Sequence, residues 1–337
     1  MSGGVDSSVA AALLLEQGYN VIGITMSLHN SAQGAGSSVE TDAKRVADAL
    51  GIPHHVVDLS TEFKNHVTDY FINEYRRGRT PNPCIVCNHR IKFGAMLNAA
   101  RELGADCVAT GHYADIAESE GRWRLMCAAD ERKDQTYFLN RLTQEQFSCA
   151  VLPLSGIDKA RVRAVAQGLG LTVADKKDSQ EICFIPDGDY AAYIERQTGK
   201  SPVGEFIFGG KAVGEHNGII RYTVGQRKGL GIALGEPVFI TKIDPAANRI
   251  YLGTEGSQYK RELTASEMNW ISTDGMTRPF RCRAKIRYNA RAADCEVFPD
   301  GDGVRVTFDT PQKAVTPGQS VVFYDENSVI GGGIINA

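Results

Sequence analysis

Short apolar segments alternate with longer stretches of helical periodicity over the first 199 residues of the chain. Residues 21–26, 55–59 and 107–110 are apolar runs of strand length. Helical patterns cover 9–17 and 37–50, continue to about 76 after the second strand, and cover 88–103, where Asn88 is the predicted N-cap. This strand–helix alternation predicts an α/β domain with a doubly wound parallel sheet.

The pattern changes after about residue 200, where turn signals recur every 8–12 residues. Residues 237–243 and 249–253 flank a predicted hairpin turn, and further strands are predicted at 281–288, 304–308 and 321–324. This part is therefore expected to be β-rich and barrel-like. We predict a domain at 1–199, a small central β-rich domain at 200–262 and a C-terminal β-barrel-like domain at 263–337.

Composition is that of a soluble globular protein, with 337 residues, 42% hydrophobic and 23% charged residues. No signal peptide or membrane span is recognisable, so a cytoplasmic protein is expected by elimination. A net charge of −3 means that any nucleic-acid site is a local patch. Eight cysteines in such a protein do not predict a disulfide framework. Most are expected to be buried thiols, namely Cys107, Cys127, Cys149, Cys282 and Cys295.

A glycine-serine turn opens the chain directly before the first helical run. Two glycines allow a tight turn that aims several N–H groups at one anion, and the following helix N-terminus adds positive potential. The turn consists of Ser2, Gly3, Gly4, Val5, Asp6, Ser7 and Ser8. It lacks the Walker A lysine, so it predicts a pyrophosphate site other than a P-loop. A doubly wound sheet places a strand before such a turn; the sequence begins at the turn and does not decide between a start further upstream and a truncated chain.

Two cysteines in a C-x-x-C motif, Cys84 and Cys87, precede the helix predicted at 88–103. The helix dipole, with Arg90 and Lys92 nearby, is expected to favour the thiolate of Cys87. Three other interpretations stay open: a zinc site with His89 as a third ligand, a thioredoxin-type redox motif, and plain buried thiols. Cys183 lies in a second cysteine motif beside polar residues 178–181.

Taken together, these motifs resemble the tRNA-specific 2-thiouridylases of the PP-loop ATP pyrophosphatase superfamily. The matching stretches span nearly the whole chain and read SGGVDSS, GRTPNPC-x-x-CN, IKF, ATGHYA, KDQTYFL, DS-x-x-ICFI, GEH, TVGQRKGLG, RCRAKIRY, VTPGQSVVFY and GGGII. The resemblance implies ATP-dependent 2-thiolation of the wobble uridine of tRNA. ATP with Mg²⁺ would adenylate the C2 oxygen, and a cysteine persulfide would then deliver sulfur and release AMP.

The resemblance also implies roles for individual residues. Cys87 corresponds to the nucleophilic cysteine and Cys183 to the cysteine that becomes the persulfide, and the two could pair as a disulfide after transfer. Residues 2–8, Met26 and Gly111 correspond to positions that bind ATP. The positions implied to contact tRNA are Asn82, Pro83, Cys84, His112, Lys133, Asp134, Gln135, Arg287, Tyr288 and Gln319. The implied partners are tRNA and a persulfide donor, either a cysteine desulfurase or a sulfur relay protein.

The predicted strand at 281–288 alternates basic and apolar residues. Period two places the four cations Arg281, Arg283, Lys285 and Arg287 on one face, which suits a phosphate backbone. The alternative is a solvated outer strand whose cations pair with acidic residues elsewhere.

Cys84 departs from the family pattern, because many members carry aspartate there. Three thiols around one site, Cys84, Cys87 and Cys183, could instead hold a [4Fe–4S] cluster. Other functional alternatives are a 4-thiouridine synthetase-like or amidating PP-loop enzyme, and a non-catalytic tRNA-binding module with a structural metal.

Overall fold

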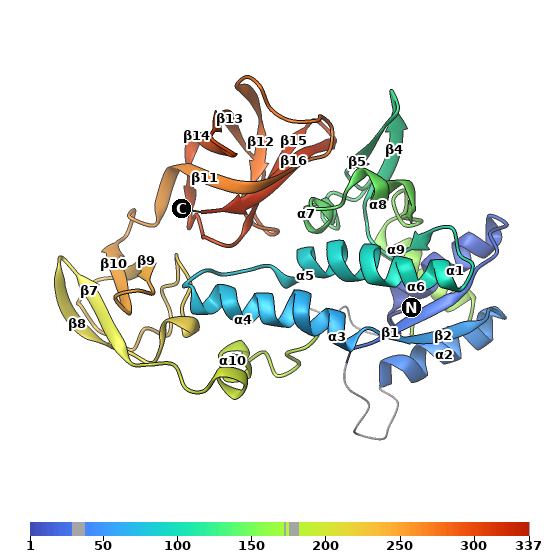
Figure 1. Ribbon diagram of the computed structural model, residues 1–337, viewed down its shortest axis with the longest axis horizontal. Helices are drawn as coiled ribbons and strands as arrows, with labels where there is room; N and C mark the ends of the chain where they lie inside the picture. The colour runs from blue at the N-terminus through green and yellow to red at the C-terminus, as the bar shows by residue number, and fades with distance from the viewer. Residues whose placement is uncertain (29–37, 172, 175–181, 337) are drawn as a thin grey trace. The chain divides into compact units, whose positions relative to one another are not determined.

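The computed structural model describes residues 1–28, 38–171, 173–174 and 182–336 (Figure 1). These residues form two compact units. The first comprises Met1–Val67, Cys84–Gln180 and Glu326–Val329, and the second comprises Thr68–Pro83, Glu181–Asp325 and Ile330–Ala337. No helix within the described ranges is long and apolar enough to cross a membrane.

The first unit is the predicted α/β domain. Its strands are β1 (Gly23–Ser27), β2 (His54–Asp58), β3 (Val108–Ala109), β4 (Asp115–Ser119), β5 (Arg122–Met126) and β6 (Ala150–Val151). β1 pairs with β2 and β3 with β6, both in parallel. The parallel α/β organisation is therefore confirmed, with the parallel strands arranged as two pairs. β4 and β5 form an antiparallel hairpin that also pairs with Ser328 and Val329.

Helices of the first unit follow the predicted order. They are α1 (Val5–Glu16), α2 (Ser38–Leu50), α3 (Ser60–Phe63), α5 (Pro83–Val86), α6 (Met96–Glu102), α7 (Thr136–Leu139), α8 (Gln144–Ser148) and α9 (Lys159–Gly168), with π-helical segments η1 (Lys64–Thr68) and η2 (Cys87–Ala95). α1 is apolar on nearly all sides and is buried along most of its length. It packs with Val162 and Ala166 of α9 in one hydrophobic cluster, which fixes the first turn of α1 within the domain.

One predicted helix boundary is wrong. The sequence placed the start of a helix at Asn88, whereas helical structure begins at Pro83 and continues through η2 into α6. Asn88 is buried in η2, and its side-chain amide donates to the carbonyl of Phe138 over 3.0 Å. The dipeptide Asn82-Pro83 was the overlooked signal, because Pro is favoured at the first helical position. The capping residue expected for α2, Ser37, lies outside the described residues.

The second unit is β-rich, as the turn spacing predicts. It begins with helices α4 (Asp69–Arg76), α10 (Tyr190–Thr198) and the short 3₁₀ segment η3 (Ile219–Arg221). A four-stranded sheet has the order β8 (Lys211–His216), β7 (Gly204–Phe208), β10 (Arg249–Thr254) and β9 (Val238–Asp244). The predicted hairpin is confirmed as the antiparallel pair of β9 and β10.

Six further strands close into a barrel (Figure 1). They follow the order β11 (Tyr259–Trp270), β14 (Gly303–Lys313), β13 (Ala293–Asp300), β12 (Phe280–Lys285), β15 (Ser320–Asp325) and β16 (Ser328–Ile335), and β16 pairs back onto β11. Alternate residues of each strand face inward and fill the barrel, with Phe308 and Phe323 among the largest fully buried side chains.

We expect the barrel core to set the stability of the second unit. Replacing Phe323 with Ala removes a fully buried ring and should lower the free energy of unfolding by about 3–5 kcal/mol. Tyr259→Ala is the matched control, because this side chain is 46% exposed, and its effect should stay within about 0.5 kcal/mol. Chemical denaturation followed by tryptophan fluorescence measures both. Similar losses in the two variants would contradict this account of the core.

Candidate functional site

The glycine-serine turn is stabilised by hydrogen bonds from the hydroxyl groups of its own serines. Ser2 and Ser7 hydrogen-bond to each other through their hydroxyls over 3.1 Å, and both Ser7 and Ser8 donate to the carbonyl of Gly4. Gly4 is the N-cap of α1 in an extended conformation, and none of the described side chains caps the helix. The first N–H groups of α1 therefore point out of the turn, which is the arrangement that binds an anion. We refer to residues 2–8 as the phosphate turn for this reason.

Two glycines bring the neighbouring backbone against this turn. A Cβ atom on Gly111 would lie 2.7 Å from the carbonyl carbon of Asp6 and 2.8 Å from the backbone nitrogen of Ser7. Gly3 has a φ of +60°, and a Cβ there would lie 2.9 Å from the carbonyl oxygen of Val39. Gly111 follows β3, so the carboxyl end of a parallel strand lies directly beside the phosphate turn. Met26, the penultimate residue of β1, is half-buried.

Asp6, in the first turn of α1, is held by two side chains. Lys159 at the start of α9 donates to its two carboxylate oxygens over 2.7 and 2.9 Å, and the hydroxyl of Tyr113 donates to one of them over 2.8 Å. Tyr113 is itself fixed by Gln135, which exchanges two hydrogen bonds with its backbone. The loop that carries Gln135 is thereby connected to the phosphate turn.

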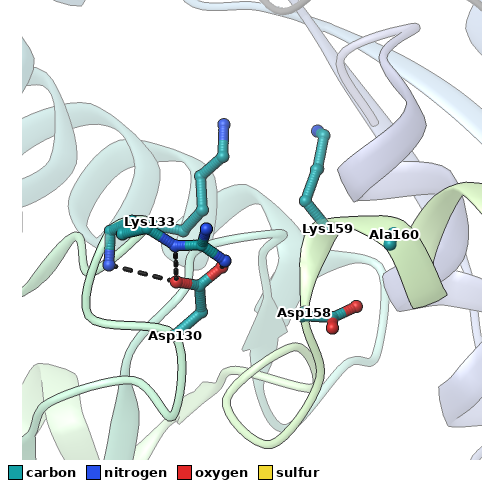
Figure 2. Close-up of a pocket in the computed structure, with 6 residues that line it drawn as sticks. Asp130, Lys133, Asp158, Lys159 and Ala160 are labelled. Carbon is teal, nitrogen blue, oxygen red and sulfur yellow. Dashed lines mark hydrogen bonds and ion pairs between the residues drawn. The ribbon is translucent and has the colours of Figure 1, made fainter.

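A cavity of about 300 Å³ lies beside this ion pair. It is lined by Asp130, Arg132, Lys133, Asp158, Lys159 and Ala160. Figure 2 shows the side chains of Lys133 and Lys159 extending in the same direction with open space between them. Arg132 instead folds back onto the carboxylate of Asp130. Lysine ammonium groups beside a phosphate turn make the cavity suitable for anionic groups.

The C-x-x-C motif lies within the helix and not before it. Cys84 is in the first turn, in α5, and Cys87 is the first residue of η2. The helix dipole acts mainly over the first turn, so it gives little support to a thiolate at Cys87, and the effect expected from Arg90 and Lys92 stays a prediction. Cys84 is exposed to solvent on one side, but the protein atoms packed around it desolvate the thiol. This desolvation raises the pKa of the thiol, and the positive charge of Lys92 lowers it by a smaller amount.

A single glutamine supports the π-helical segment that begins at Cys87. The amide nitrogen of Gln146 donates to the carbonyls of His89 and Phe93 over 2.7 and 2.9 Å, and its oxygen contacts Nδ1 of His89 at 3.0 Å. π-Helical turns are frequent at functional sites, and here their carbonyls are satisfied by a neighbouring element. Burial lowers the pKa of His89, and its bond to Gln146 opposes this shift.

The remaining cysteines differ from the prediction. Five thiols were expected to be buried, and of these only Cys295 is. Cys107 is exposed, and Cys127, Cys149 and Cys282 are partly exposed. Cys282 and Cys295 are opposite each other on β12 and β13, with their sulfur atoms 3.7 Å apart. Cys183 is exposed in a turn before α10, and residues 178–181 of its motif lie outside the described residues.

Metal sites receive no support within the described residues, where no group of three or more His, Cys, Asp and Glu side chains is placed to hold an ion. The structure therefore lends nothing to the zinc interpretation of the C-x-x-C motif or to a structural metal. Cys84 and Cys87 belong to the first unit and Cys183 to the second, and we derive no step through a [4Fe–4S] cluster.

The positions implied to contact tRNA have different surroundings. His112 is buried, with Nδ1 2.7 Å from the Thr110 hydroxyl. Asp134 is buried too, and its carboxylate accepts from the backbone of Ala128 and the hydroxyl of Thr136. Both side chains face inward in the first unit. Lys133 lines the cavity, Gln135 supports Tyr113, and Asn82 and Pro83 lie at the start of α5.

In the second unit, Gln319 and Thr80 lie together. The amide of Gln319 donates to the carbonyl of Thr80 over 2.7 Å, and the backbone nitrogen of Thr80 donates to Pro317. The segment before Asn82 and Pro83 is therefore hydrogen-bonded to the residues that precede β15 of the barrel in the same unit.

The basic strand forms as β12 but ends at Lys285, three residues before the predicted end, so Arg281, Arg283 and Lys285 share one face and Arg287 lies beyond it. Several of them are engaged within the barrel: Arg281 pairs with Asp309, and Lys285 lies 5.3 Å from the centre of the Tyr324 ring. Arg287, just past the strand, donates to the carbonyls of Lys313 and Ala314. Arg281 thus agrees with the alternative interpretation, in which the cations of a solvated outer strand pair with acidic residues. Tyr288, the next residue after Arg287, is half-buried.

Sequence reasoning missed Lys159, Tyr113 and Gln146. Asp158 is the N-cap of α9 and accepts from the backbone of Arg161, so the helix start was recognisable. Nothing local to the sequence shows that Lys159 meets Asp6, which lies 153 positions away. Tyr113 stands inside the ATGHYA motif but carried no role of its own.

Comparisons with known proteins cover the whole chain. Family models match it as tRNA methyl transferase HUP domain over residues 1–187, PRC-barrel domain over 192–254 and aminomethyltransferase β-barrel domain over 260–335. The tRNA-specific 2-thiouridylase MnmA of Acetivibrio thermocellus is 52% identical over 99% of this chain and 97% of its own. MnmA of Clostridium acetobutylicum is 49% identical, covering 99% and 98%. The predicted fold class is thereby confirmed.

Solved structures are more distant. The U34-tRNA thiolase NcsA of Methanococcus maripaludis, solved with its [4Fe-4S] cluster, is 21% identical, covers 58% of this chain and 64% of its own, and has a TM-score of 0.35. A likeness this weak carries no argument about the present chain.

Gly111→Ala tests the close contact between β3 and the phosphate turn. Because the added methyl group would lie 2.7–2.8 Å from the backbone of Asp6 and Ser7, the turn has to shift, and we expect ATP affinity to fall about tenfold or more. Gly156→Ala is the matched control, since nothing lies within 4 Å of its added Cβ. Equilibrium ATP binding measures both, and equal affinities would show that the contact does not shape the nucleotide site.

Burial holds the pKa of His112 well below its ordinary value, with the charge of Lys92 adding to the shift. The unfolded chain therefore takes up this proton more readily than the folded chain, so the free energy of unfolding should fall as the pH drops below about 6.5. His112→Gln removes that titration, and its stability should fall less between about pH 7.5 and 5.5. His54, His89 and His216 shift in the same direction, so the wild-type minus variant difference is the informative quantity. Parallel pH profiles in urea denaturation would refute this role of His112.

Proposed function

The chain belongs to the family of the tRNA-specific 2-thiouridylases, and on that premise we propose that it is an ATP-dependent tRNA-uridine 2-sulfurtransferase. Its substrate is the wobble uridine of tRNA, which it thiolates at position 2. The observation that carries the proposal is about 50% identity to curated 2-thiouridylases across the full chain. An uncapped phosphate turn at the N-terminus of α1 supports it, because activation of uridine by ATP requires such a site.

The first step activates the base. Uridine O2 attacks the α-phosphate of ATP, an O–P bond forms, and the bond to the β-phosphate breaks to release pyrophosphate. Residues 2–8 bind the phosphates, and Met26 and Gly111 line the adenosine side. Mg²⁺ would neutralise phosphate oxygens, and its ligands would come mainly from nucleotide and water, because Lys159 and Tyr113 already engage the carboxylate of Asp6.

Sulfur transfer is the second step. Cys183 carries the persulfide, whose terminal sulfur attacks carbon 2 of the adenylated uridine while AMP leaves with the C2 oxygen. The thiolate of Cys87 then attacks the inner sulfur of Cys183 and forms a disulfide, and the terminal sulfur stays on the base. Reduction of that disulfide by an external thiol returns the enzyme. The exposure of Cys183 supports its role as the acceptor from a donor protein, a cysteine desulfurase or a sulfur relay protein.

Three domains divide this work in our proposal. Residues 1–199 activate and thiolate, residues 200–262 form the small central domain, and residues 263–337 form the tRNA-contacting barrel. tRNA contacts are proposed at Asn82, Pro83, Cys84, His112, Lys133, Asp134, Gln135, Arg287, Tyr288 and Gln319. For the buried His112 and Asp134, local rearrangement or backbone contact would be needed. A cytoplasmic location follows from the tRNA substrate.

A thiolation assay tests the proposal. Full-length protein is incubated with ATP, a persulfide donor and unmodified tRNA, and the product is detected by its retardation on a mercury-containing gel. We expect product with the wild type and with Cys107→Ser, an exposed thiol outside both motifs, but a loss of at least about 100-fold with Cys87→Ser or Cys183→Ser, because each removes a reacting sulfur. Unchanged product in both variants would overturn the assignment of the thiols.

A further inference from the structure

Asp6 places a negative charge inside the site that has to receive a polyanion. It is in the first turn of α1, between Val5 and Ser7 of the phosphate turn. A carboxylate at this point repels phosphate groups, and the repulsion is strong because part of the surroundings is protein and not water. Some partner has to cancel that charge before the turn can bind ATP with useful affinity.

Lys159 is placed to supply that positive charge. Its ammonium contacts both oxygens of Asp6, over 2.7 and 2.9 Å, and the two side chains are only 13% and 31% exposed. Partial burial reduces screening by salt, so this pair acts more strongly than a surface ion pair. Tyr113 adds a neutral hydrogen bond to the same carboxylate, and its ring centre lies 6.0 Å from the ammonium.

The position of Lys159 is fixed by the fold. It is the first residue of α9, whose start is set by the Asp158 cap and whose buried residues Val162 and Ala166 pack in the same cluster as α1. The two helices therefore hold the pair at a constant separation.

We propose that Lys159 is a positioning residue of the nucleotide site: it neutralises Asp6 and holds the carboxylate to one side, so that the phosphate turn can accept the phosphates of ATP. The inference rests on the proposed function, which places ATP at this turn, and it adds a residue to which no motif pointed. Lys159 acts through Asp6 and not by contact with the reacting atoms.

A double-variant cycle separates this role from a direct contact with ATP. Lys159→Met leaves the charge of Asp6 uncompensated, and ATP affinity should fall about 10- to 100-fold. With Asp6→Asn there is no charge left to neutralise, so adding Lys159→Met should then cost no more than about threefold. Lys159→Arg keeps the cation and should stay within about fivefold of wild type.

Equilibrium ATP binding by calorimetry is measured on the full chain in EDTA, so that Mg²⁺ does not contribute to the comparison. Arg161→Met is the matched control: it removes one exposed cation from the same helix and should leave affinity unchanged. Unchanged affinity in Lys159→Met overturns the proposal. So does an undiminished loss in the Asp6→Asn background, which would mean that Lys159 contacts the nucleotide directly.

The cycle stays decisive if Lys159→Met alone does not fold, because neither Asp6→Asn nor the double variant leaves a carboxylate in the turn without its partner. Thermal unfolding of every variant checks this point. A wild type that fails to bind ATP both in EDTA and with Mg²⁺ present would overturn the proposed function, and the present inference with it. A wild type that binds ATP while Lys159→Met binds equally well overturns the present inference only.

Discussion

The close contact between Gly111 and the first turn of α1 determines how the nucleotide end of this protein is built. Because no side chain fits between Gly111 and the backbone of Asp6 and Ser7, the carboxyl end of β3 meets the phosphate turn directly. Tyr113, two residues further on, is thereby brought to Asp6. The hydrogen bond from Tyr113 to Asp6 follows from that approach of two backbones, and the packing of α9 with α1 brings Lys159 to the same carboxylate.

The helical segment that carries Cys84 and Cys87 depends on a different arrangement. Pro83 starts it, and a π-helical segment begins at Cys87, where the usual helical hydrogen bonds give way to longer-range ones. Gln146 satisfies two carbonyls of that segment while also capping α8. The orientation of Cys87 therefore rests on an element almost 60 residues later in the chain.

Three arginines in the described part of the chain are engaged by oxygen atoms of their own unit. Arg281 and Arg287 of the barrel and Arg132 of the first unit are each engaged by nearby oxygen atoms. With a net charge of −3, recognition of a polyanionic tRNA cannot rest on overall attraction.

The sequence alone determined the fold class, the β-hairpin at β9 and β10, the alternating faces of β12 and the phosphate turn, because periodicity, turn residues and glycine spacing are local properties. It also indicated Gly111, through a motif. The predicted helix start at Asn88 and the predicted burial of Cys107 were wrong, because the residue at which a helix begins and the exposure of a side chain both depend on neighbouring elements. Only the tertiary structure decided that Lys159 meets Asp6 and that Gln146 supports the segment at Cys87, because these pairs are joined by helix packing between residues far apart in the chain, which leaves no pattern in the sequence.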